Sequence, residues 1–292
     1  MNITSLSARA MLATLNIRRW QAARTDKKIS TEVAKTHAVK EKRAGKYRKN
    51  AIDIDAPTFK AVGTAASELR AKNNFYTLPW SQDGSRILTT VNFEEYAAAM
   101  RSLRVVFEHA VKDFKDDYPA LKAAARIELN GMYNENDYPT DIGAKFGVDL
   151  SFMPLPDAQD FRASLPDGTV QEIKQGIETE LQQTLKKAMR DPYERLYSHI
   201  SRMVERLSDK EGVFRDTLVT GLADLCAILP GLNLNGDPKL DDLRKRAEQM
   251  IAHVDPQDLR DVPSVRRDVV RQAAHIQNLM QGYMGAAPSE AA

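Results

Sequence analysis

The chain has 292 residues, 42% of them hydrophobic, which is enough for one large or two modest domains with apolar cores. Its 42 lysines and arginines nearly balance its 40 aspartates and glutamates, which excludes a protein that is polycationic over its whole surface. No apolar run approaches the length of a membrane span, and the N-terminus lacks the apolar core of a signal peptide, so we expect a cytosolic protein without membrane contact.

Positive charge is concentrated at the N-terminus. Residues 1–50 hold thirteen basic and three acidic residues, so this segment carries about +10 and the remainder about −8. Residues 6–21 predict a short helix or a strand-like arm, and residues 25–50 predict a solvated helix followed by a flexible segment. Trp20 and Tyr47 lie among the cations, as on nucleic-acid-binding surfaces where bases stack on rings and cations meet phosphates. The alternative is an exposed helical face whose aromatic side chains dock into the core.

The most distinctive stretch is Phe75–Arg86, which crowds three aromatic residues, a proline and an Asp-Gly pair into twelve residues. An irregular edge hairpin about Asp83-Gly84 is predicted, because Pro79 excludes a regular central strand. We interpret this stretch as a structural junction in which Trp80 anchors a core or an interface. A platform for base stacking is the alternative role of that side chain.

Hydrophobic periodicity predicts helices over most of the remaining chain. Asn92 and Glu95 form a capping signature before a long helix. That helix is expected to stop at Tyr118-Pro119, with a shorter helix returning antiparallel. Alternating apolar residues predict one strand at 146–152 and a second at 161–165, joined as a hairpin that pairs with the element at 75–91. The other helices are expected at residues 57–73, 169–188, 191–207, 213–229, 240–254 and 265–283.

No residue pattern indicates catalysis or a cofactor. The five histidines have no cysteine or second histidine at ligand spacing, and no phosphate-binding glycine loop is present. The single cysteine, Cys226, excludes an intrachain disulfide, and its apolar neighbours predict a buried thiol in a reducing compartment. The acidic turn at residues 134–140 does not follow the calcium-loop pattern. We therefore expect a non-enzymatic protein with no catalytic residue, metal or cofactor.

These elements predict a mainly α chain with a small antiparallel β element, an α+β fold in which long amphipathic helices pack as hairpins or a bundle beside a short sheet. Heptad-like apolar seams, typical of coiled coils, also predict a homo-oligomer. Composition and pattern divide the chain into a basic N-terminal region, an α+β region with β-hairpins and a helical hairpin, a helical C-terminal region and a flexible tail. Their ranges are residues 1–50, 51–168, 169–283 and 284–292.

Several segments carry a resemblance to a known family. They are LNIRRW at 15–20, TDKK at 25–28, GKYRK at 45–49, YTLPW at 76–80, GSRIL at 84–88 and the strands predicted within 146–161. Over residues 3–283 the chain resembles a family of phage, prophage and plasmid proteins described as a domain of unknown function. The resemblance implies a mobile-element origin, a bacterial cytoplasm, and association with a MoxR-like AAA+ ATPase or a von Willebrand A-type protein. It brings no catalytic residue.

Two functions are consistent with these features. The favoured hypothesis is a non-enzymatic phage or mobile-element protein that binds DNA or RNA through its basic N-terminal region. The alternative is an adaptor or assembly subunit whose helical body binds a protein partner such as the MoxR-like ATPase. The predicted nucleic-acid-binding residues are Arg18, Arg19, Trp20, Lys27, Lys28, Lys42, Arg43, Lys46, Tyr47, Arg48 and Lys49, with Trp80 and Arg86 extending the surface.

Overall fold

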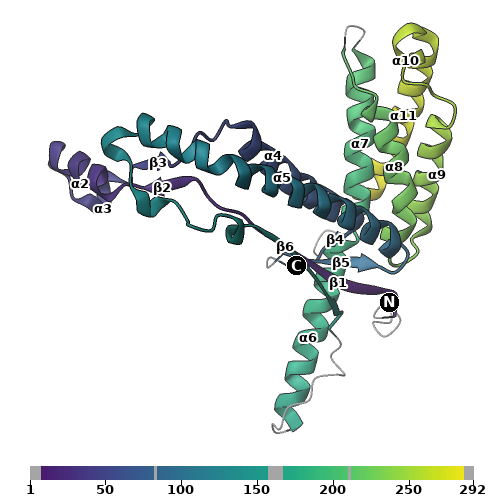
Figure 1. Cartoon of the computed structure of the whole chain (residues 1–292). Coiled ribbons are helices and arrows are strands. Elements are labelled where there is room, and N and C mark those ends of the chain that lie inside the picture. Colours follow the sequence, from purple (N-terminus) through teal and green to yellow (C-terminus); the bar gives the residue numbers. More distant parts are fainter. Residues whose placement is uncertain (1–7, 82–83, 157–166, 210–211, 286–292) are drawn as a thin grey trace. The chain divides into compact units, whose positions relative to one another are not determined.

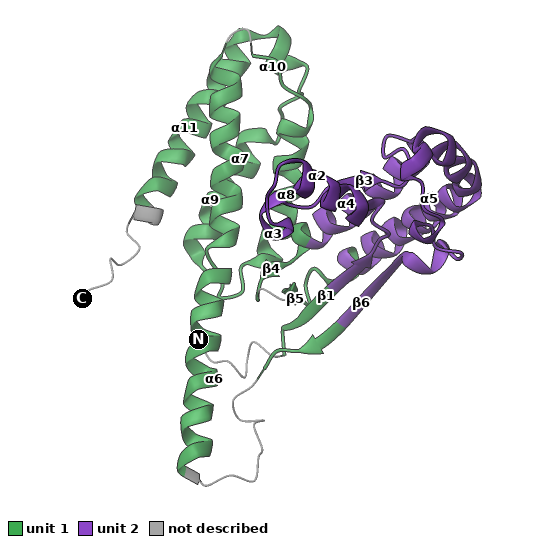
Figure 2. Cartoon of the chain, turned by 90° about the vertical axis from the view of Figure 1, so that its left-hand side faces the viewer, with its two compact units in different colours: residues 1–14, 74–95, 152–292 green, residues 15–73, 96–151 purple. Residues whose placement is uncertain are grey.

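The computed structural model describes residues 8–81, 84–156, 167–209 and 212–285, except for the side chains of residue 167 and residues 283–285. The chain is mainly helical with a small four-stranded antiparallel sheet (Figure 1), which confirms the predicted α+β class. It divides into two compact units (Figure 2). Unit 1 comprises residues 1–14, 74–95 and 152–292, and unit 2 comprises residues 15–73 and 96–151. This division rests on contacts between distant segments, so its boundaries differ from the consecutive ranges drawn from charge and pattern.

The C-terminal part of unit 1 is a helical bundle. Its helices are α6 (Asp167–Ala188), α7 (Asp191–Ser208), α8 (Thr217–Leu232), α9 (Pro238–Ile251), α10 (Asp258–Asp261) and α11 (Pro263–Gly285). Helices α7, α8, α9 and α11 contact one another in a closed cycle around a shared apolar core. Helices α6 and α7 are separate elements, divided at residues 189–190. Cys226 is buried in α8, as predicted, and burial raises the pKa of its thiol to about 12.

The four-stranded sheet has the order β4-β5-β1-β6. Its strands are β1 (Ala10–Arg18), β4 (Leu78–Pro79), β5 (Ser85–Thr89) and β6 (Gly147–Pro154). The N-terminal arm is therefore a strand rather than a helix. Strands β4 and β5 form the predicted edge hairpin, with Leu78 opposite Ile87 and Pro79 opposite Arg86. In β6, Val148 and Leu150 alternate with exposed Asp149 and Ser151 as predicted, but Phe152 is exposed. The neighbour of β6 is β1, not β5. The second strand predicted at 161–165 lies outside the described residues.

Unit 2 is built on two long helices, α4 (Pro57–Tyr76) and α5 (Phe93–Glu128). The last three residues of α4 and the first three of α5 belong to unit 1. Its core contains a cluster of aromatic rings that includes Trp20, Phe59, Phe114, Tyr118 and Phe146. Short helical turns η1 (Asn130–Met132), η2 (Glu135–Asp137) and η3 (Gly143–Lys145) connect α5 to β6.

The predicted break at Tyr118-Pro119 and the shorter antiparallel helix expected after it are both wrong, because α5 continues through Pro119 to Glu128. Proline lacks one backbone N–H but holds a φ angle that a helix accepts. Tyr118 on one side of Pro119 and Ala125 on the other are both buried. Packing on both sides of the proline therefore maintains the helix despite the missing hydrogen bond. The end of α8 shows the same effect on a smaller scale, since that helix passes Pro230 and ends at Leu232.

Candidate nucleic-acid interface

Residues 23–50 form a small lobe of unit 2, hereafter the basic lobe. It consists of β2 (Ala23–Thr25), α2 (Lys27–Thr36), α3 (Glu41–Ala44) and β3 (Arg48–Asn50). The two strands pair antiparallel, with Arg24 opposite Lys49, and α2 contacts α3. Figure 1 shows these elements gathered at one end of unit 2. The part expected to be a solvated helix followed by a flexible segment is thus a closed β-hairpin with two helices in its connection.

Local hydrogen bonds explain why the lobe closes. The Asp26 carboxylate caps α2 by accepting a hydrogen bond from the Ile29 backbone N–H at 3.1 Å. Asp26 also donates its backbone N–H to the Tyr47 carbonyl at 3.0 Å. The Ser30 hydroxyl donates to the Asp26 carbonyl and accepts from the Tyr47 backbone N–H at 3.0 Å. The start of α2 and the start of β3 are therefore held together through their main chains.

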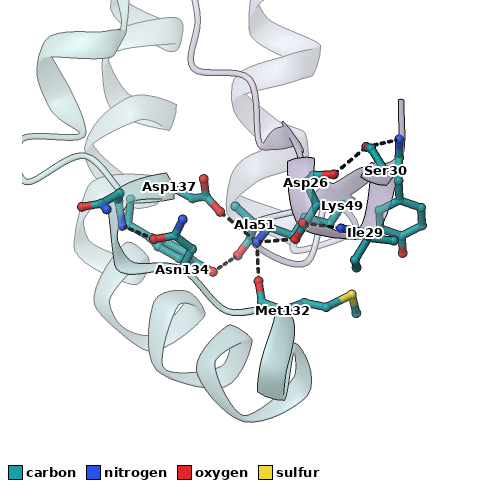
Figure 3. A network of polar contacts seen from close by, with 11 residues as sticks. Asp26, Ile29, Ser30, Lys49, Ala51, Met132, Asn134 and Asp137 are labelled. Carbon is teal, nitrogen blue, oxygen red and sulfur yellow. Dashed lines mark hydrogen bonds and ion pairs between the residues drawn. The ribbon is translucent and has the colours of Figure 1, made fainter. Parts of the chain in front are cut away.

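Lys49 sits at the centre of a polar network that joins the lobe to the rest of unit 2 (Figure 3). Only 6% of the surface of Lys49 is exposed. The ammonium lies 3.3 Å from an Asp26 carboxylate oxygen and 3.0 Å from an Asp137 carboxylate oxygen, and it donates to the Met132 carbonyl. All three donor hydrogens of the ammonium thus have an acceptor within reach. The acidic turn at 134–140 supplies an internal counter-charge.

Apart from Arg24, which is half-buried with its guanidinium 5.3 Å from the Trp20 ring centroid, the remaining cations of the lobe point to solvent. Eight lysine and arginine side chains are exposed, and within the described ranges none of them has an ion-pair partner. Asp26 is engaged by Lys49, so only Glu32 and Glu41 offset them locally. The eight exposed cations and these two carboxylates therefore leave about +6 at the surface, and Arg24 brings the whole lobe to about +7. The eight exposed cations are Lys27, Lys28, Lys35, Lys40, Lys42, Arg43, Lys46 and Arg48.

Three of these cations share one face of α2. Lys27, Lys28 and Lys35 lie within about one quadrant of the helix, because successive residues are rotated by about 100°. They line a surface depression together with Thr31, Thr36 and the single carboxylate of Glu32, so the depression is net positive. A side of a helix that carries lysines and hydroxyls suits the oxygens of a phosphate backbone.

Tyr47 is the exposed aromatic residue of the lobe, with 42% of its surface accessible. It lies between Lys46 and Arg48, and its backbone is fixed by the hydrogen bonds to Ser30 and Asp26. A ring held in this way can accept a base without further ordering of the main chain.

Not all predicted site residues lie on this surface. Trp20 is 3% exposed and packs edge-on against Phe59 and Tyr118, so the alternative of a docked aromatic residue holds for this ring. Lys49 is buried in the network described above. Arg19 is half-buried, and burial together with the nearby Arg70 lowers the pKa of its guanidinium.

Arg18, Trp80 and Arg86 also have other surroundings. Arg18 lies 3.4 Å from the Asp149 carboxylate in an exposed ion pair. Trp80 and Arg86 belong to unit 1. Trp80 is half-buried against the apolar core of that unit, as expected of an anchor. Arg86 donates from Nε to the Thr77 hydroxyl at 2.7 Å and from its terminal nitrogen to the Thr77 carbonyl at 3.2 Å. The Phe75–Arg86 stretch is therefore a structural element of unit 1.

Lys35 and Lys40 belong to the exposed set but are absent from the residues predicted to bind. Both lie within the N-terminal run of basic residues, so counting charge along the whole lobe would have included them. Within the described part of the chain no cluster of three or more histidine, cysteine or carboxylate side chains could hold a metal ion. Over the same residues, no helix combines the length and apolarity that a bilayer requires. Comparison with protein-family models, curated proteins and solved structures finds no match.

Proposed function

We propose that this protein binds nucleic acid through the basic lobe and does not act as an enzyme. The observation that carries the proposal is the set of eight exposed cations, on a lobe of 28 residues, that have no ion-pair partner among the described residues. Holding such like charges together is unfavourable unless an anion is present. A phosphate backbone supplies closely spaced negative charge and gains free energy through the release of its counterions.

The lobe offers two kinds of contact. The α2 lysines and the cations of α3 would meet phosphates, which fixes position without reading sequence. Tyr47 would stack on an unpaired base, and this contact favours single strands over duplexes. Binding through these groups is expected to show little sequence preference, because neither kind of contact reads base edges.

The test measures fluorescence polarisation of labelled single-stranded DNA, duplex DNA and single-stranded RNA with the full chain. Affinity should fall steeply with salt, because log K falls with log salt in proportion to the number of phosphates neutralised. The variant K27Q/K28Q/K35Q should lower the magnitude of the duplex slope by about 3, since each lysine removed leaves roughly one phosphate without its cation. The matched control K186Q/K187Q/R190Q removes the same charge from exposed positions of unit 1 and should leave the slope unchanged.

Two results would refute the proposal. One is the absence of binding to all three nucleic acids at about 50 mM salt, where electrostatic binding is strong. The other is an equal loss of affinity in the control variant, which would mean that only total charge matters. In either case a protein partner, as in the adaptor alternative, would be the better explanation of the lobe.

A further inference from the structure

Unit 1 contains a surface pocket at the C-terminal half of α7 and the start of α8. Its volume is about 260 Å³, and it is lined by His199, Arg202, Arg206, Phe214, Arg215 and Leu218, among others. The pocket is separate from the basic lobe in sequence, and all its lining residues belong to unit 1. Nothing in the proposed function uses it.

Over the described part of the bundle, five arginines have a carboxylate partner. Arg195, Arg244 and Arg260 each pair with a carboxylate, at 2.6, 2.9 and 2.5 Å respectively. Arg246 and Arg271 also have acidic partners three or four residues away. Arg190 and Arg267 are exposed without an acidic partner among the described residues, so the three pocket arginines are distinguished by lining one hollow together.

Arg202, Arg206 and Arg215 are exposed, and among the described residues none of them has an acidic partner. Arg202 and Arg206 are four residues apart on α7, so they share one helix face and repel each other. Arg215 adds a third positive charge from the connection to α8. Three guanidinium groups around one hollow form an arrangement that an anion would stabilise.

The rest of the pocket is apolar and firmly held. Phe214 is 8% exposed, and the guanidinium groups of Arg260 and Arg266 lie 4.9 Å and 5.7 Å from its ring centroid. Arg266 also donates from Nε to the Leu207 carbonyl at 2.9 Å. These contacts hold Phe214 and the end of α7 against α10 and α11, so the apolar side of the pocket exists before any ligand binds.

His199 completes the wall between the two helices. Its Nε2 lies 2.9 Å from the Leu218 carbonyl oxygen and must donate to it, because a carbonyl has no hydrogen to give. A Cβ at Gly221 would lie 3.2 Å from the imidazole ring, so the glycine allows this close approach of the ring to α8. The Leu218 carbonyl thus engages Nε2 of the ring, and Nδ1 takes no part in that hydrogen bond.

We infer that this pocket binds a small phosphate-bearing anion, with Arg202, Arg206 and Arg215 as its ligands. A planar guanidinium offers two parallel N–H groups that match two oxygens of a phosphate. The apolar wall made by Phe214 and Leu218 suits the organic part of a phosphate ester. The inference is independent of the proposed function, since a different unit and different residues carry it.

The test is titration calorimetry of the full chain at constant ionic strength with inorganic phosphate, a nucleoside monophosphate and the nucleoside without phosphate. Phosphate and the monophosphate should bind saturably, and the nucleoside should not. The variant R202Q/R206Q should weaken binding about a hundredfold, because each guanidinium that pairs with the phosphate strengthens binding roughly tenfold. The control R190Q changes an exposed arginine beyond the opposite end of α7 and should bind like the wild type.

Each possible outcome decides the question. Binding of the monophosphate without binding of inorganic phosphate would support the inference and identify an ester as the source of the phosphate. Equal binding of the nucleoside, or no saturable binding of either phosphate compound, would overturn it. Equal affinity of R202Q/R206Q and R190Q would also overturn it, because the arginines would then have no part in binding. Circular dichroism of both variants shows whether the bundle remains folded.

Discussion

Replacing Lys49 with methionine tests whether the buried network holds the basic lobe in place. Methionine keeps most of the aliphatic length of lysine but removes the ammonium. The Met132 carbonyl and the Asp137 carboxylate then lose the Lys49 ammonium as a donor. In the wild type that ammonium lies 3.0 Å from the Asp137 carboxylate oxygen. Asp26 keeps its hydrogen bond from Ile29, so the cap of α2 is retained. The substitution therefore isolates the link between the lobe and the turn at residues 130–137.

The expected loss of stability follows from burial. Removing one partner of a buried ion pair costs about 3–5 kcal/mol, because the other charge is left without compensation. The Lys49 side chain is 5% exposed, whereas those of Asp26 and Asp137 are 13% and 17% exposed and can regain some water. We therefore expect K49M to lower the free energy of unfolding by about 3 kcal/mol, the lower end of that range.

Urea unfolding followed by circular dichroism gives the free energy, and hydrogen exchange over residues 23–50 locates the effect. The control is K46M, which removes an exposed lysine from the same hairpin and should change stability by less than about 0.5 kcal/mol. If K49M and K46M unfold at the same urea concentration with equal slopes, the Lys49 network contributes nothing to stability. Unchanged exchange within the lobe would lead to the same conclusion.

Three further predictions concern the core, the interface and pH. A Cβ at Gly231 would lie 2.1 Å from the Asn92 amide oxygen, so G231A should lower the free energy of unfolding by about 2–4 kcal/mol. The control G176A changes a glycine of α6 that faces open space, and it should raise that free energy by about 0.5–1 kcal/mol. Urea unfolding measures both. Y47A should weaken polarisation-measured binding of single-stranded DNA by about 1–3 kcal/mol and duplex binding much less. The Ile29 N–H bond, with Lys49, lowers the pKa of Asp26. The contribution of the Asp26 carboxylate to the free energy of unfolding is therefore complete above its ordinary pKa of about 3.9 and is lost as the pH falls through the lowered value. The variant D26N should remove this pH dependence of stability.

The helices of unit 1 are readable from the sequence because their apolar periodicity coincides with their burial. Spacing alone places Leu196, Ile200, Met203 and Leu207 on one stripe of α7, and all four are buried. In the same way, the proline and Asp-Gly signals predicted the β4–β5 edge hairpin. Local rules succeed at these positions because the short-range pattern and the tertiary packing require the same structure.

Pro119 shows where local rules fail. A proline after a tyrosine predicts a helix end, but burial on both sides of it outweighs the missing hydrogen bond. The N-terminal arm and the partner of β6 depended likewise on long-range pairing, which periodicity within a short segment does not encode.

The sequence by itself determined the mainly helical class, the concentration of cations within the first fifty residues and the buried state of Cys226, because each depends on composition or on short-range spacing. Only the tertiary structure decided which of those cations face solvent. Lys49 and Arg48 are neighbours in the same basic run, yet one is buried between two carboxylates and the other is exposed. The difference arises because a strand turns successive side chains to opposite faces, and the turn at residues 134–140 packs against one face only.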